Sequence, residues 1–157
     1  MLKYVDVAVT FSEVPDEIAL CIDISNCPCH CEGCHSAYLA KDIGTELTQR
    51  ALEQFIRENN GVSCVCLMGG DSEPEIVNLL GDVIHMRGKK SAWYSGRQEL
   101  SDKIDLKNFD YIKLGPYIPS KGGLDNPNTN QKFYEVCRLP SKFMLKDITN
   151  KFWKNVQ

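Results

Sequence analysis

Three cysteines, Cys27, Cys31 and Cys34, stand close together in the segment SNCPCHCEGCHS (25–36). Their C-x3-C-x2-C spacing brings three thiols together in one loop. The loop consists of small and polar residues and has few apolar side chains that could pack into a core. The start of the chain lacks the uninterrupted apolar core of a signal peptide, so we expect a cytoplasmic protein. Disulfides are rare in that compartment, and clustered cysteines there more often bind metal or act in catalysis.

Three thiolates from one loop can hold three irons of a [4Fe–4S] cluster. The fourth iron would then be open to a substrate, as one position is in catalytic metal sites. Cys29 lies inside the motif, and we expect it not to bind iron because a ligand set that includes it suits a cubane poorly. A structural zinc site is the alternative, with Cys29, Cys21, His30 or His35 as fourth ligand, although the chain has no clean second C-x2-C pair.

Strand and helix patterns alternate along the chain, which predicts an α/β fold with a mostly parallel sheet and crossover helices. Strands are expected at 4–10, 17–24, 62–68, 90–94, 110–114, 132–138 and, more weakly, 142–148. Helices are expected at 49–59 with Thr48 as cap, from a capping box of Ser72 and Glu75 to a stop at Gly88, and, short and polar, at 97–103.

A length of 157 residues predicts a single domain, 1–157. A complete eight-stranded barrel needs about 250 residues, so we expect a partial, open β/α barrel. The net charge of −3 argues against a nucleic-acid partner. No apolar run approaches the roughly 20 residues that span a bilayer, which argues against a membrane partner.

The cysteine loop resembles the signature of radical S-adenosylmethionine enzymes. In that family the open iron binds S-adenosylmethionine, and one electron splits this cofactor into methionine and a 5′-deoxyadenosyl radical. The turn Gly69-Gly70-Asp71 resembles the family's Gly-Gly-Glu motif, which contacts the amino group of the cofactor. The resemblance further implies adenine contacts around the third cysteine, made by Gly33, Cys34 and His35.

Other positions carry weaker signals. His35 is nearly as well explained as an ordinary, half-exposed loop histidine. Ser95 lies near a predicted strand end, where α/β folds place ligands, and is a further candidate for a cofactor contact. The same holds for Tyr94, Gly96 and Lys113. The remaining cysteines are most simply buried small residues, namely Cys21, Cys64, Cys66 and Cys137.

The segment DYIKLGPYIPSKGGLDNPNTNQKFYEV (110–136) resembles the C-terminal stretch of anaerobic ribonucleotide reductase activating proteins, which carry an Asn-Gln pair, here Asn130-Gln131. This resemblance implies an enzyme that removes hydrogen from a glycine of anaerobic ribonucleoside-triphosphate reductase and takes electrons from a flavodoxin- or ferredoxin-type donor. We expect the loop 115–131 to line the partner-binding side. The alternatives are a compact radical enzyme for a small molecule, similar to 7-carboxy-7-deazaguanine synthases, and a non-catalytic iron–sulfur or zinc protein.

Overall fold

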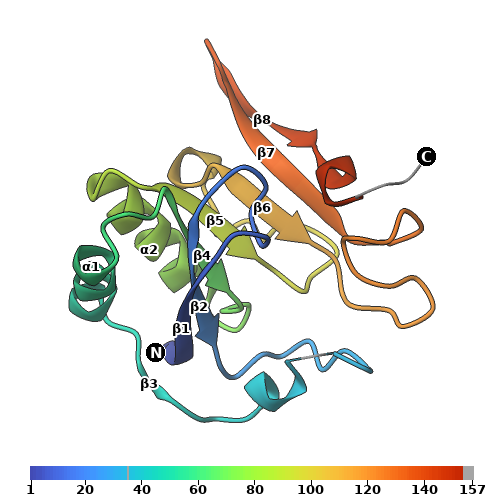
Figure 1. Ribbon diagram of the computed structural model, residues 1–157, viewed down its shortest axis with the longest axis horizontal. Helices are drawn as coiled ribbons and strands as arrows, with labels where there is room; N and C mark the ends of the chain where they lie inside the picture. The colour runs from blue at the N-terminus through green and yellow to red at the C-terminus, as the bar shows by residue number, and fades with distance from the viewer. Residues whose placement is uncertain (35, 154–157) are drawn as a thin grey trace.

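A computed structural model describes residues 1–34 and 36–153, which form an α/β fold around one mixed sheet of eight strands (Figure 1). The order across the sheet is β3-β1-β2-β4-β5-β6-β7-β8. The strands are β1 (Lys3–Thr10), β2 (Ala19–Ile24), β3 (Thr45–Glu46), β4 (Cys64–Met68), β5 (Lys90–Tyr94), β6 (Tyr111–Leu114), β7 (Lys132–Leu139) and β8 (Lys142–Asp147). The helices are α1 (Gln49–Glu58) and α2 (Pro74–Met86), with short 3-10 turns η1 (Ala37–Ala40), η2 (Leu106–Asn108) and η3 (Thr149–Phe152).

The parallel arrangement expected from the sequence is confirmed only for the centre of the sheet, where β2, β4, β5 and β6 run parallel. The outer pairs β1–β2, β1–β3, β6–β7 and β7–β8 are antiparallel. No helix crosses between β1 and β2 or between β7 and β8, and strands joined by such direct connections pair antiparallel. The strands at the two ends of the order, β3 and β8, do not pair with each other, so the sheet is open.

The two faces of the sheet are packed differently. Helices α1 and α2 lie together over one face, where Figure 1 shows them beside the central strands, and bury a large aliphatic core. The opposite face carries small side chains on the central strands, among them Ala19, Cys66 and Ala92, below the aromatic ring of Phe133. These small and aromatic side chains form a second, smaller core on that face.

Most predicted elements form, with strand ends that differ by at most two residues, and Thr48 caps α1 by accepting the Ala51 N–H. The capping box of Ser72 and Glu75 is wrong, because α2 begins at Pro74 and its N-cap Glu73 makes no side-chain cap bond. Pro74 instead occupies the first helical position, where its missing N–H leaves one donor fewer without a partner.

The helix predicted at 97–103 is also wrong. The hydroxyls of Ser95 and Ser101 accept the N–H groups of Arg97 and Lys103, and such local bonds hold the backbone in turns instead. Over the ranges that the structure describes, every helix is too short or too polar to cross a bilayer.

Candidate functional site

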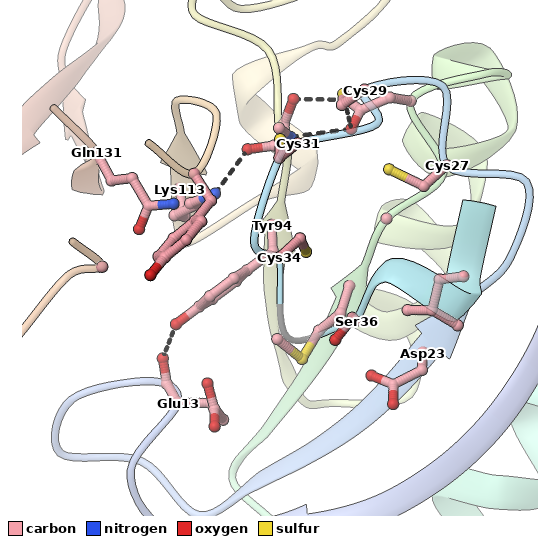
Figure 2. A pocket seen from close by; sticks show the side chains of 18 of the residues that line it. Glu13, Asp23, Cys27, Cys29, Cys31, Cys34, Ser36, Tyr94, Lys113 and Gln131 are labelled. Carbon is pink, nitrogen blue, oxygen red and sulfur yellow. Dashed lines mark hydrogen bonds between the residues drawn. The ribbon is translucent and has the colours of Figure 1, made fainter. Parts of the chain in front are cut away.

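A cavity of about 880 Å³ lies beyond the carboxyl ends of the parallel strands β2, β4, β5 and β6. The loops that follow these strands line it, together with part of the segment 115–131. This is the edge at which open α/β sheets generally bind ligands, because the loops there converge from different strands. Figure 2 shows the cavity with the cysteine loop on one side and Gln131 on the other.

The cysteine loop leaves β2 and is fixed at its base by backbone hydrogen bonds. The N–H of Cys27 donates to the carbonyl of Leu39 at 2.9 Å, and the hydroxyl of Ser25 donates to the carbonyl of Ile43 at 2.6 Å. Within this loop the backbone adopts positive φ at Asn26 and His30. Two non-glycine residues in this sparsely populated region mark a loop whose shape is imposed by its surroundings.

Cys27, Cys31 and Cys34 all line the cavity, and their thiols are free of disulfides. Three half-buried thiols beside one cavity have the chemistry that an iron–sulfur cluster needs. Among the described residues, no group of three or more His, Cys, Asp and Glu side chains is arranged to hold a single metal ion.

Cys29 faces a different partner from the other three cysteines of the loop. Its thiol donates to Oδ2 of Asp71 at 3.7 Å, which joins the cysteine loop to the turn after β4. Burial, with the nearby negative charge of Asp71, raises the pKa of Cys29 to about 12. Cys29 is thus the cysteine of the loop that bonds to the turn after β4.

The turn after β4 depends on its glycines. Gly69 and Gly70 have φ values of 112° and 91°, a region that L side chains rarely adopt. A Cβ on Gly69 would lie 2.9 Å from the carbonyl oxygen of Ile24, and one on Gly70 would lie 2.6 Å from Cγ2 of Val77. Side chains at these two positions would therefore prevent the turn after β4 from lying close to the end of β2.

Asp71 is buried and organises the loop after β5. Its Oδ1 accepts the hydroxyl of Ser95 at 2.5 Å, and its Oδ2 accepts the N–H of Gly96 at 2.9 Å. Gly96 is also restricted by packing, because a Cβ there would lie 2.8 Å from Sγ of Cys29. One carboxylate thus connects the loops that follow β2, β4 and β5.

Lys113 places a buried cation in the wall of the cavity. Its Nζ donates to the carbonyl oxygens of Ser95 at 3.2 Å and Gly115 at 2.8 Å and lies 5.9 Å from the centre of the Tyr94 ring. Burial lowers the pKa of Lys113 from its ordinary value. Among the described residues that line the cavity, Lys113 carries the sole basic side chain.

Acidic and amide side chains complete the lining, and the sequence analysis did not select them for the site. Glu13 follows β1, Asp23 lies near the end of β2, and Gln131 precedes β7. Burial, with the charges of Asp6 and Glu13 nearby, raises the pKa of Asp23. An acidic residue inside the apolar strand 17–24 was the available sequence signal for Asp23. Gln131 was noted only as half of the Asn-Gln pair.

The predicted site residues are only partly brought together. Beside Cys27 and Cys31, four of the predicted cofactor contacts line the cavity, namely Cys34, Gly69, Asp71 and Ser95. Gly70 is buried beneath the turn, and Gly33 is exposed, where a Cβ would lie 3.2 Å from Pro119. His35 lies outside the described residues.

A scan against models of protein families finds no match for this chain, and neither a search of curated proteins nor one of solved structures finds any.

Proposed function

We propose that this chain holds a [4Fe–4S] cluster through Cys27, Cys31 and Cys34 and uses it to cleave S-adenosylmethionine reductively. The fold in this proposal is a partial, open barrel of the radical S-adenosylmethionine type. The biological substrate is a glycine of anaerobic ribonucleoside-triphosphate reductase, and a flavodoxin or ferredoxin supplies the electron. The observation that carries the proposal is the direct contact between the cysteine loop and the Gly69-Gly70-Asp71 turn through Cys29.

That contact is informative because the two motifs lie far apart in the sequence. Cys29 and Asp71 are 42 residues apart, yet their side chains meet beside one cavity that three further cysteines line. The sequence resemblance requires the two motifs to serve one ligand. Their convergence at the carboxyl ends of β2 and β4 supports this reading.

When bound, the cluster would supply one electron that breaks the sulfur–carbon bond to the adenosyl group, giving methionine and a 5′-deoxyadenosyl radical that takes a hydrogen atom from the substrate glycine. The protein's own residues bind and orient. Asp71 accepts three hydrogen bonds, and since a carboxylate has about four acceptor positions, one remains for an ammonium donor. Lys113, which like Asp71 is hydrogen-bonded to Ser95, adds the opposite charge to the cavity, with one ammonium hydrogen still free for a carboxylate.

The first experiment is anaerobic iron and sulfide analysis, followed by electron paramagnetic resonance of the reduced protein before and after addition of S-adenosylmethionine. We expect about four irons per chain and a spectrum that changes when the cofactor binds. Zinc in place of iron, or a cluster whose spectrum ignores the cofactor, would overturn the proposal and leave a binding or electron-transfer protein.

The substrate needs a second measurement on the same preparation. Incubation with reductant, S-adenosylmethionine and anaerobic ribonucleoside-triphosphate reductase should produce a glycyl radical signal on the reductase. Cleavage of S-adenosylmethionine without that signal would keep the radical chemistry but reject this protein substrate, and it would favour a small molecule.

A further inference from the structure

Three cysteines outside the cysteine loop lie in the second, smaller core of the sheet. Cys21 is 5% exposed, and Cys64 and Cys66 are fully buried beside it. All three carry free thiols, and the proposed function uses none of them. A buried thiol on its own behaves as a small apolar group. Whether these thiols have chemistry of their own therefore depends on how they lie relative to one another.

Cys21 of β2 and Cys66 of β4 are direct partners in the parallel pairing of these strands. Neighbouring strands lie about 4.8 Å apart, within the separation of roughly 4.4–6.8 Å between Cα atoms that a disulfide allows. The two thiols are hydrogen-bonded to each other in the same core. Cys64 differs, because its partners in register are Ala19 on β2 and Lys90 on β5. Of these three thiols, Cys21 and Cys66 are therefore the two that are placed for a bond.

The two paired thiols differ in how readily they lose a proton. The hydrogen bond from Cys66 outweighs burial and lowers the pKa of Cys21, whose Sγ also lies 3.4 Å from the hydroxyl oxygen of Thr10. Burial raises the pKa of Cys66. Because the thiolate is the reactive species, Cys21 is the thiol that meets an oxidant first, and Cys66 is the thiol that resolves the product. A thiol that is only 5% exposed admits a small oxidant and excludes a bulky one.

The pair lies directly beneath the cavity of the candidate site. Two residues further along the same strands, Asp23 and Met68 are again partners in register, and both line that cavity. β2 then continues into the cysteine loop, and β4 continues into the turn at Gly69. A covalent link between Cys21 and Cys66 would therefore fix the spacing of the two strands that carry the two motifs of the site.

We propose that Cys21 and Cys66 form a redox pair, which a peroxide converts into a disulfide that joins β2 to β4 beneath the cavity. The inference goes beyond the proposed function and needs no bound cluster. The Cys21 thiolate attacks one oxygen of hydrogen peroxide, and the O–O bond breaks to give a sulfenic acid and hydroxide. The Cys66 sulfur, after losing its proton to hydroxide, attacks the sulfenic sulfur, so that the S–S bond forms and the S–O bond breaks. In total the two thiols lose two electrons and two protons, and the peroxide becomes two waters.

The test is thiol mapping on the full chain, purified anaerobically and exposed to hydrogen peroxide. Free thiols are then blocked, the chain is cleaved at Asp23 to separate Cys21 from the cysteine loop, and the peptides are identified by mass spectrometry. We expect a peptide that links Cys21 to Cys66, the loss of these two from the eight thiols of the chain, and their return after treatment with a dithiol reductant. Cys21 and Cys66 that both stay free after the thiols of the cysteine loop have been oxidised would overturn the inference.

Two alanine variants test the roles within the pair. Cys66→Ala should stop at the sulfenic acid of Cys21, which dimedone labels, because no second thiol resolves it. Cys64→Ala is the matched control, equally buried in the same strand, and should form the disulfide as the unchanged protein does. Loss of the link in Cys64→Ala would overturn the inference. Equal labelling of Cys21 in Cys66→Ala and in the unchanged protein would do the same.

Stability gives an independent measurement. The link joins positions 21 and 66 and so restricts the unfolded chain between them, which stabilises the folded state if the link fits the native geometry. The oxidised protein should therefore unfold at a higher denaturant concentration than the Cys66→Ala variant after the same peroxide treatment, and a reductant should remove the difference. An oxidised protein that unfolds at the same or a lower concentration would overturn the placement of the pair.

Discussion

The carboxylate of Asp71 accepts a hydrogen bond from the hydroxyl of Ser95 over 2.5 Å, although 24 residues separate them in the chain. Ser95 is 1% exposed, so neither group can turn to water for a replacement partner. The bond ties the end of β5 to the turn after β4 and fixes the wall of the cavity at the point where both loops reach it.

Replacement of Ser95 by alanine should lower the free energy of unfolding by about 2 kcal/mol, because Oδ1 of Asp71 loses its donor while buried. It should also weaken binding of S-adenosylmethionine, measured by calorimetry, while iron content stays unchanged. The control is Ser91→Ala in β5, the strand that Ser95 follows, where the buried hydroxyl makes no hydrogen bond with the described residues. That control should be neutral or slightly stabilising, and equal losses in both variants would contradict the role given to Ser95.

Replacement of the loop cysteines should separate ligands from non-ligands. Each of Cys27→Ser, Cys31→Ser and Cys34→Ser should lose most of the iron, measured per chain after anaerobic purification, because serine is a poor ligand for iron–sulfur clusters. Cys29→Ser should keep the iron, since a hydroxyl can still donate to Asp71. Loss of iron in all four variants would show that Cys29 belongs to the ligand set.

Replacement of Gly70 by alanine should destabilise the protein by about 3 kcal/mol or more, since the new methyl group meets both an unfavourable φ of 91° and the side chain of Val77. Gly88→Ala is the matched control, with a φ of 77° but no atom within 4 Å of its new Cβ. It should cost only about 1 kcal/mol. Chemical denaturation of both variants measures the difference, and equal costs would show that contact with Val77 is unimportant.

Glu17 should make the free energy of unfolding depend on pH. Its side chain is buried, and its Oε2 lies 2.9 Å from Nζ of Lys90 and 2.7 Å from the hydroxyl of Tyr111. Burial alone would raise the pKa of Glu17, but these hydrogen bonds outweigh it, so the pKa lies below the ordinary value. The stabilisation is therefore present above the pKa of the unfolded chain, about 4.3, and is lost as the pH falls through the lower folded value.

The variant Glu17→Gln should accordingly lose about 1–2 kcal/mol of unfolding free energy at pH 7 and progressively less towards pH 3. Denaturant titrations across this range test the slope. The exposed control Glu99→Gln should leave the curve unchanged. A loss that is constant with pH would mean that shape, and not charge, accounts for the contribution of Glu17.

Local signals in the sequence determined the secondary structure and the cysteine loop. Alternating and buried apolar runs predicted the strands, and Thr48 predicted the start of α1. The spacing of the thiols singled out the loop 25–36. These signals act over a few residues, so neighbouring side chains are enough to carry them. They failed at 97–103, where serine hydroxyls bond to nearby backbone N–H groups, and at Ser72, because the helix begins at Pro74 instead.

The tertiary structure decided how the sheet is ordered and which side chains share the cavity. Strand direction depends on the connections and on which edges find partners. The antiparallel pairs β1–β3 and β6–β7 join segments that no short-range pattern brings together. Cys29 contacts Asp71, and Glu13 and Gln131 line the same cavity, because the ends of different strands come together in space. The sequence alone determined the chemical groups available to this protein. Long-range packing determined which of them act together, because contacts between distant residues follow from the whole fold.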